Sequence, residues 1–196
     1  MEPLEILDTQ TEAQAAGKKL NATVAITVAL LATFMGICKV KDDNINQSMQ
    51  QAQANRVDHW AFYQARNVRE EVARSTVVQL RLASAGKPAA EQAAYQQAIQ
   101  EYEKVAQDQA TKKADAKAQA EQDQKTYDAA NFKDDQFDLS DALLAIAISL
   151  LAITALTQLW ALYFTALVPT AFGVLMGLSG LAGWGLHPDS LIALLS

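Results

Sequence analysis

The sequence predicts an all-α membrane protein with three transmembrane helices and a long antiparallel helical hairpin, a coiled coil, inserted between the first and second spans. Residues 20–38 and 139–186 are almost free of charge, whereas residues 39–138 hold 14 of the 16 Lys and Arg and 16 of the 22 Asp and Glu. Within that charged region, the only Gly and Pro are Gly86 and Pro88. Segregation of this kind is typical of a membrane protein with one sizeable polar domain.

The net charge of −6 argues against a nucleic-acid partner, because phosphate contacts need a basic face. The hairpin alone sums to 14 − 16 = −2. The chain has one cysteine, Cys38, which excludes an intramolecular disulfide and a cysteine-based metal cluster.

Residues 1–19 are expected to form a mobile acidic tail, because they are polar and too short to fold alone. Residues 20–38 predict the first transmembrane helix, because this uncharged stretch is long enough to cross a hydrocarbon core of roughly 30 Å. A cleaved signal peptide fits less well, since no small-residue cleavage site follows. Thr23 and Thr27 share one helix face, where they either line a pore or bond within packed helices.

Residues 39–138 predict the hairpin, with its turn at residues 85–88, where Gly ends one helix and Pro begins the next. The first arm carries apolar residues on several faces and the second on one, so we expect the first arm inside a bundle of several copies. Antiparallel pairing about the turn would place Trp60 near Lys112 and Lys113. The apolar stripe of the second arm comprises Tyr95, Ile99, Tyr102, Ala106, Ala116, Ala120 and Tyr127.

Residues 139–186 predict a transmembrane helical hairpin, since the apolar run is too long for one crossing. The favoured turn lies at residues 157–160, and the alternative turn is at Val168 and Pro169. Asp138 or Ser140 is expected to cap the helix that enters the membrane. Residues 187–196 would form a short C-terminal tail with one interfacial turn. Small residues that allow close helix packing in this hairpin are Gly173, Gly177, Gly180 and Gly183.

No catalytic motif stands out, and we expect no enzyme, no metal site and no cofactor. His59 and His187 are the only histidines, and neither has a second ligand at metal-binding spacing. Glu70 and Glu71 lie near His59 and Arg66, but charges this dense on a helix indicate a solvated or salt-bridged face.

The segment from Trp60 to Asn67 concentrates aromatic residues that the rest of the hairpin lacks. Large rings and buried polar groups would select one helix arrangement over others, which favours a structural role in register. A recognition patch for another protein or ligand is the competing hypothesis. The residues expected at the oligomer and packing interface are Trp60, Phe62, Tyr63, Gln64, Asn67, Val68, Val72 and Leu80.

The run Trp-Ala-Phe-Tyr-Gln-Ala-Arg-Asn at residues 60–67 follows an N-terminal span and precedes a polar coiled coil and two C-terminal spans. In this respect the chain resembles a bacterial membrane-protein family catalogued as domain of unknown function 4337, over most of residues 20–185. The resemblance implies a small three-span membrane protein and carries no activity or catalytic residue. The chain departs from the family pattern by lacking basic residues in the turn at residues 157–160.

The sequence therefore favours a homo-oligomeric membrane scaffold, with a channel with a coiled-coil vestibule and an accessory subunit of a larger membrane complex as alternatives. The expected partners are the lipid bilayer, further copies of the chain and an unidentified membrane protein. The positive-inside rule favours a cytoplasmic hairpin, in a bacterial inner (plasma) membrane, because five basic residues near the span ends on its side stand against Lys18 and Lys19; they are Lys39, Lys41, Arg56, Lys125 and Lys133.

Overall fold

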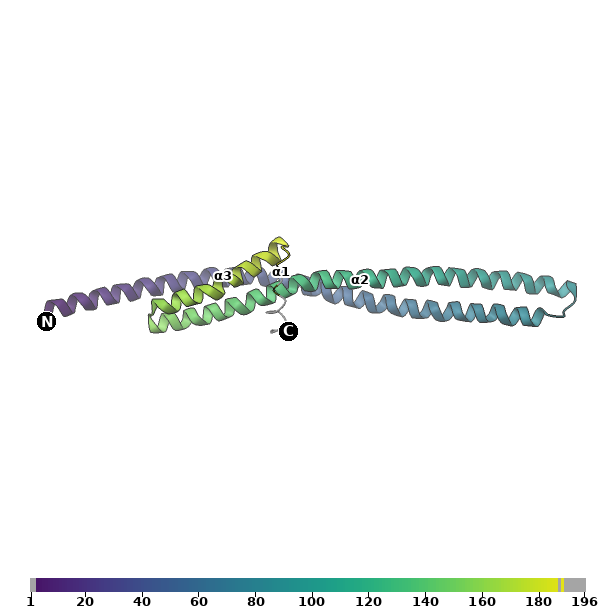
Figure 1. The fold of residues 1–196 in the computed structure, drawn as a ribbon, viewed down its shortest axis with the longest axis horizontal. Coiled ribbons are helices and arrows are strands. Elements are labelled where there is room, and N and C mark those ends of the chain that lie inside the picture. Colours follow the sequence, from purple (N-terminus) through teal and green to yellow (C-terminus); the bar gives the residue numbers. More distant parts are fainter. Residues whose placement is uncertain (1–2, 187, 189–196) are drawn as a thin grey trace. The chain divides into compact units, whose positions relative to one another are not determined.

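The computed structural model describes the backbone of residues 3–186 and 188, and the side chains of residues 15–186 and 188. Three helices account for nearly all of this part of the chain: α1 (Pro3–Ser84), α2 (Ala89–Thr157) and α3 (Trp160–Ala182) (Figure 1). No strand occurs among the described residues, so the all-α class is confirmed. Each helix is long and apolar enough to cross a membrane, by length and composition.

The chain divides into two compact units, each of which is built from segments of α1 and α2. Met1–Gln47 and Ala130–Ser196 form one, called the apolar unit below, and Ser48–Ala129 form the other, called the hairpin unit. The predicted C-terminal tail at residues 187–196 lies outside the described residues, apart from Pro188. Residues 3–19, which the sequence predicts as a tail, belong to α1, and Gly17 is the only Gly or Pro after Pro3 in this stretch.

The prediction of a helix cap at Asp138 or Ser140 is wrong, because α2 runs from Ala89 to Thr157 without a break. No Gly or Pro occurs over that range, so the i to i−4 hydrogen-bond ladder continues and leaves no free N–H groups to cap. The Ser140 hydroxyl instead donates to the backbone oxygen of Gly173 in α3, at 2.8 Å.

Both turns lie where the sequence predicts them. At the first, Gly86 has a φ of 80°, which suits glycine, and the amide of Lys87 donates to Ser84 O at 3.2 Å. At the second, Gln158 has a φ of 55° between the end of α2 and the start of α3. The alternative turn at Val168 and Pro169 is not used, since α3 passes through Pro169.

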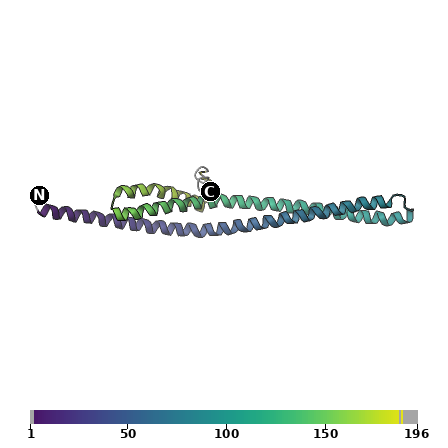
Figure 2. The same cartoon turned by 90° about the horizontal axis from the view of Figure 1, so that it is seen from below.

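In the apolar unit, α2 turns back into α3 and both lie beside α1 (Figure 2). The core of this unit is formed by Leu20, Val24, Leu31, Leu144, Ala147, Leu151 and Ala166. Large apolar side chains also cover the outside, among them Ile26, Leu30, Ile37, Ile146, Leu156, Phe164 and Phe172.

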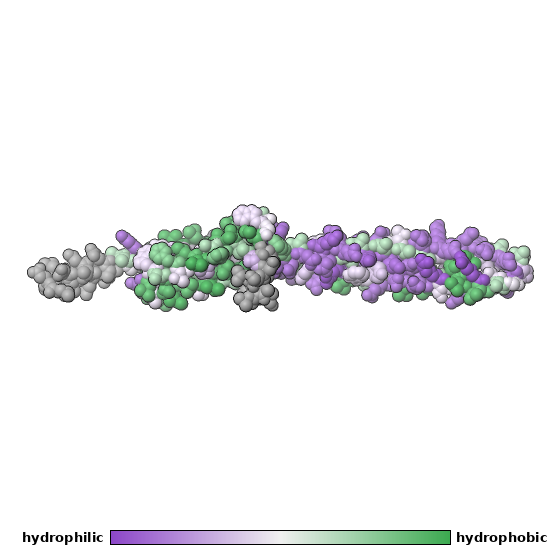
Figure 3. All heavy atoms as spheres, viewed as in Figure 1, coloured by the Kyte–Doolittle hydropathy of each residue, from purple (hydrophilic) through white to green (hydrophobic). Residues whose placement is uncertain are grey.

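A few polar side chains are buried beside the apolar core of the same unit. Gln136, Ser140, Thr154 and Ser179 are fully buried, although the exposed surface is apolar (Figure 3). A water-soluble bundle has a polar exterior, so the apolar exterior of this unit suits a surface that faces hydrocarbon.

In the hairpin unit, α1 and α2 run antiparallel, and side-chain bonds join them from Arg56 with Gln124 to Arg81 with Glu103. The predicted position of Trp60 beside Lys112 and Lys113 is wrong, because Trp60 lies over Ala120. The connecting residues extend along the hairpin before the chain reverses, so the first turns of α2 reach beyond the end of α1 (Figure 1). This offset displaces the register by several residues.

Candidate functional site

The side of α1 that faces α2 in the hairpin unit repeats at alternating steps of three and four residues. Met49, Ala52, Ala73 and Val77 on this side are buried, and the same spacing in α2 places Ile99, Ala106, Ala116 and Ala120 in the contact. Alternating spacing of this kind keeps one helix face directed toward a partner along many turns. The predicted apolar stripe of the second arm is therefore confirmed, with Tyr102 as its most exposed member.

Charged and amide side chains occupy several positions in this same contact. His59 Nδ1 lies 2.6 Å from Asp123 Oδ2, and Arg66 donates to Gln109 Oε1 at 3.1 Å. Buried polar groups without their partners would be costly, so these pairs select one register of α1 against α2.

A third pair joins Glu70 and Lys113, whose charged atoms lie 2.6 Å apart. Glu70 also bonds Arg74 at 2.8 Å, and Lys113 donates to Asn67 Oδ1 at 3.1 Å. The hydrogen bond from Lys113, followed by that from Arg74, lowers the pKa of Glu70. The bond between Lys113 and Glu70 also raises the pKa of Lys113. Sequence reasoning treated Glu70 as a surface charge, because its partner in α2 was not visible in the sequence.

A second row of apolar residues lies on the part of α1 that α2 leaves exposed. We call this row the outer face of α1 and define it by six residues: Val57, Ala61, Val68, Val72, Val78 and Leu82. All six are exposed, and the exposed fraction reaches 72% at Leu82. The row has no partner among the described residues, and exposed apolar rows of this length mark interaction sites.

The corresponding outward side of α2 is different in kind. It carries Glu101, Lys104, Asp108, Asp115, Glu121 and Lys125, and the large apolar residues that this part of α2 leaves exposed are Tyr102 and Val105. A hydrated surface explains that side of α2, whereas it does not explain the outer face of α1.

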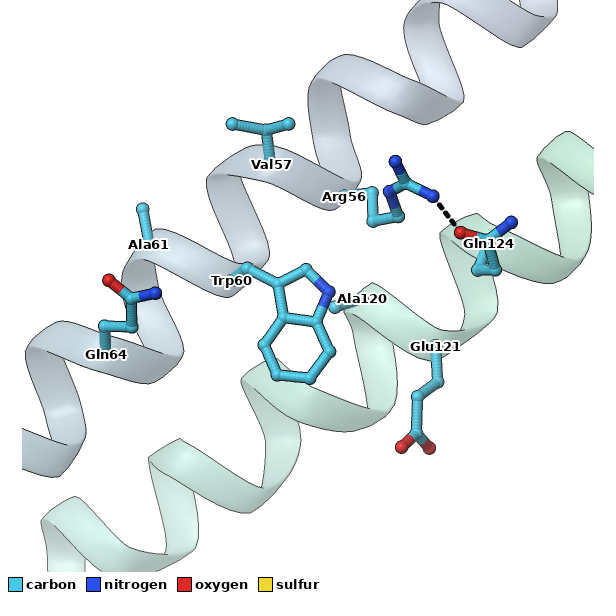
Figure 4. Close-up of a pocket in the computed structure, with 8 residues that line it drawn as sticks. All are labelled: Arg56, Val57, Trp60, Ala61, Gln64, Ala120, Glu121 and Gln124. Atoms are coloured by element: carbon cyan, nitrogen blue, oxygen red, sulfur yellow. Dashed lines mark hydrogen bonds between the residues drawn. The ribbon is translucent and has the colours of Figure 1, made fainter.

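Trp60 lies at the edge between the two sides of α1. Its indole extends over Ala120 of α2 and bounds a shallow groove of about 550 Å³, while Val57 and Ala61 point away from α2 (Figure 4). The ring also meets Tyr63 edge-on, with centroids 5.4 Å apart. Arg56 donates to Gln124 at one end of the groove.

The eight residues predicted for the interface divide between the two sides of α1. Tyr63, Asn67 and Leu80 are half-buried toward α2, and Trp60 bridges to it. The structure leaves the remaining four exposed: Phe62, Gln64, Val68 and Val72. The exposed set is available to a partner, whereas the half-buried set holds the hairpin together.

Thr23 and Thr27, the predicted pore-lining pair, bond within the apolar unit. Thr23 donates to Lys19 O at 3.0 Å, and Thr27 donates to Thr23 O at 2.9 Å. The Thr27 hydroxyl also lies 3.2 Å from the hydroxyl of Tyr163 in α3.

Three of the four predicted packing glycines lie where α3 approaches its neighbours most closely. A Cβ atom on Gly173 would lie 2.8 Å from Leu144 Cγ, one on Gly177 2.7 Å from Phe34 Cε1, and one on Gly180 2.8 Å from Phe137 Cζ. Gly183 has a different role. With a φ of 71° and nothing within 4 Å of a Cβ, it ends α3 in the left-handed conformation.

An acidic cluster joins α1 to α2 inside the apolar unit, and sequence reasoning missed it. Asn46 Nδ2 donates to Asp134 Oδ1 at 2.8 Å and to Asp42 Oδ1 at 3.4 Å, and Lys39 bonds Asp42 at 2.7 Å. Burial, followed by the neighbouring Asp42, raises the pKa of Asp134 to about 7. Burial also raises the pKa of Asp138. The Asp residues that crowd near positions 42 and 134–138 of the sequence were the signal from which this cluster could have been predicted.

Long apolar helices, an apolar exterior over buried polar groups, and a polar helical hairpin define a class of all-helical protein suited to a membrane. The chain belongs to the family described as a domain of unknown function, DUF4337, whose model matches residues 20–183. This match confirms the family that the segment at residues 60–67 indicated. No curated protein and no solved structure matches the chain significantly.

Proposed function

We propose that this chain is a non-enzymatic, membrane-anchored coiled-coil protein that assembles with copies of itself into a scaffold. The observation that carries the proposal is the outer face of α1, a row of exposed apolar side chains in an otherwise charged hairpin unit. A lone hairpin would leave this row in water at a cost of about 25 cal/mol per Å² of apolar surface. A partner that covers the row removes that cost.

In this proposal, the three apolar helical segments are membrane spans and the hairpin is inserted between the first and second of them. The exterior of the apolar unit supports this placement, since Ile26, Leu30 and Phe164 are exposed while Gln136 and Ser179 are buried. The membrane is the plasma membrane of a bacterium. The basic residues near the span ends on the hairpin's side outnumber Lys18 and Lys19 on the other, which supports a cytoplasmic hairpin; they are Lys39, Lys41, Arg56, Lys125 and Lys133.

The mass of the detergent-solubilised protein, measured by light scattering with the detergent subtracted, tests this function. We expect several times 21.2 kDa for the wild type. Val68→Glu combined with Leu82→Glu should reduce the mass to one copy, because both residues are exposed and belong to the outer face of α1. A matched control, Thr111→Glu with Ala118→Glu on the outward side of α2, should leave the assembly intact. A monomeric wild type would refute the proposal.

The alternatives predict other results. A channel lined by Thr23 and Thr27 would lose conductance in liposomes when both are replaced by Leu, whereas a scaffold would show no conductance to lose. The hydroxyl contact between Thr27 and Tyr163 supports the scaffold, because it gives Thr27 a partner inside the unit. An accessory subunit would stay monomeric when purified and would be recovered from its membrane with a different protein at fixed stoichiometry.

A further inference from the structure

We propose that Asp42 of α1 and Asp134 of α2 form a pH-sensitive switch inside the apolar unit. A proton held between their carboxyl groups keeps the two helices in contact, and its loss parts them. Asp42 is buried, with 3% of its surface exposed, and its carboxyl group is hydrogen-bonded to that of Asp134. An ionised carboxylate can only accept, so a hydrogen bond between two carboxyl groups requires a proton on one of them. This switch would act in a single copy and in an assembly alike.

The groups that bond this pair decide which carboxyl group holds the proton. Lys39 donates to Asp42 Oδ2 at 2.7 Å and stabilises a negative charge there. Asn46 Nδ2 donates to Asp134 Oδ1 at 2.8 Å and to Asp42 Oδ1 at 3.4 Å, so one amide joins both carboxyl groups. The charges that act most strongly on Asp134 all belong to acidic neighbours. The proton is therefore held by Asp134.

The helices packed around the pair add negative rather than positive charge. Lys39 already bonds two carboxylates, Asp42 at 2.7 Å and Asp43 at 3.6 Å. Lys41 and Lys133 are adjacent in sequence to the pair but are exposed. The third helix, α3, contains no charged residue between Trp160 and Ala182. The acidic groups at this level are Asp42 and Asp43 of α1, and Asp134, Asp135, Asp138 and Asp141 of α2.

This surplus of carboxyl groups gives the contact its dependence on pH. Burial, followed by the hydrogen bond with Asp42, raises the pKa of Asp134 from 3.8 to about 7. The closed contact thus binds the proton more tightly than a separated, hydrated Asp134 does, so low pH favours closing. That advantage is lost as the pH rises from 3.8 to about 7. Above this interval two carboxylates face each other, and their repulsion favours opening.

The helix that moves is α1, because α2 is bonded to α3 at the same level. Gln136 Nε2 donates to Ser179 Oγ at 3.1 Å, and Ser140 donates to the backbone oxygen of Gly173 at 2.8 Å. Neither bond involves a titratable group, so both persist when Asp134 ionises. Opening would therefore expose Ile45, which is buried one turn from Asp42 on the same side of α1.

Thiol labelling of the full chain in detergent micelles measures this opening. Cys38 is replaced by Ala, and Cys is introduced at Ile45, or at its exposed neighbour Asn44 as the matched control. The labelling rate of Ile45→Cys is divided by that of Asn44→Cys at each pH, which removes the intrinsic pH dependence of a thiol. We expect this ratio to rise at least about tenfold between about pH 5.5 and pH 8. With Asp134→Asn added, it should change less than about twofold, because the amide does not titrate.

Asp115→Asn is the control for the change of charge. It removes an exposed carboxyl group in the hairpin unit, and the full rise should remain. A ratio that does not change with pH would refute the switch, as would a rise that is equally large with Asp134→Asn.

Infrared spectroscopy keeps the test decisive if Ile45→Cys itself loosens the contact. With no cysteine change, the protein at pH 5.5 should show the C=O band of a protonated carboxylic acid, which disappears by pH 8. Asp134→Asn should lack this band, and Asp115→Asn should retain it. If the bands of the wild type and Asp134→Asn are the same, the proton belongs to another group and the switch is overturned.

Discussion

Replacing Gly180 by Ala should loosen the apolar unit, although Ala is the better helix former. The new Cβ would lie 2.8, 2.9 and 3.0 Å from three ring carbons of Phe137, whereas carbon atoms in contact are about 3.5–4.0 Å apart. Phe137 is buried, with 1% of its surface exposed, so its ring cannot swing outward to relieve the contact. Either the ring or α3 must therefore move.

The magnitude follows from two opposing effects. Overpacking of this kind costs about 1–3 kcal/mol, and the loss of glycine's extra backbone freedom returns about 1 kcal/mol. The net destabilisation of Gly180→Ala is therefore between about 0 and 2 kcal/mol. Gly36→Ala supplies the matched control, since it makes the same chemical change within α1 and its Cβ would meet nothing within 4 Å.

Reversible unfolding in mixed micelles, followed by tryptophan fluorescence, measures both variants against the wild type. Gly36→Ala should be as stable as the wild type or more stable, and Gly180→Ala should be less stable than Gly36→Ala by about 1–3 kcal/mol. Equal stabilities for the two variants would refute the reasoning, because they would mean that α3 does not approach Phe137 as closely as the structure shows.

The remaining predictions concern single contacts. Asp134 binds its proton more tightly in the folded protein than in the unfolded chain. The stability that it provides is therefore lost as the pH rises from 3.8 to about 7. Asp134→Asn should flatten that part of the pH profile and raise the melting temperature at pH 8. The contribution of Glu70 to stability changes with pH in the opposite direction, because its pKa is lowered. This contribution is present above pH 4.5 and is lost on acidification. Lys113→Met should therefore lower the melting temperature at pH 7. Gln136→Leu removes the hydrogen bonds from Gln136 Nε2 to the backbone oxygens of Trp184 and Leu186, at 2.9 and 2.6 Å. Amide hydrogen exchange in the chain after α3 should therefore accelerate, and unchanged exchange there would contradict this role of Gln136.

The helices and turns could be predicted because each depends on local sequence. The two turns coincide with Gly86 and Pro88 and with the break around Gln158, and the long helices follow from the absence of Gly and Pro between them. The one-sided stripe of the second arm was also readable, since Ile99 and Ala120 recur at helical spacing.

The contacts between helices could not be predicted, because they depend on register. A loop that extends along the hairpin shifts every pairing, so Trp60 meets Ala120 and Lys113 meets Glu70. The fully buried Gln136 and the bonds from Asn46 to Asp42 and Asp134 were missed for the same reason, since polar residues at helical spacing are as common on a wet surface. The break assumed near Asp138 came from reading those residues as a boundary.

The distribution of large and small residues around α1 connects the hairpin's folding to its assembly. Toward α2, the contact in the hairpin unit is built largely from alanines, such as Ala52, Ala73, Ala116 and Ala120, and from ion pairs. A buried methylene stabilises by about 0.8 kcal/mol, so alanines provide little, and ion pairs contribute more to register than to net stability. The larger apolar side chains are on the outer face of α1, where a single copy cannot bury them. In the proposed scaffold, a hairpin arranged in this way would gain further hydrophobic stabilisation when copies cover the outer face of α1, with α2 as the hydrated exterior.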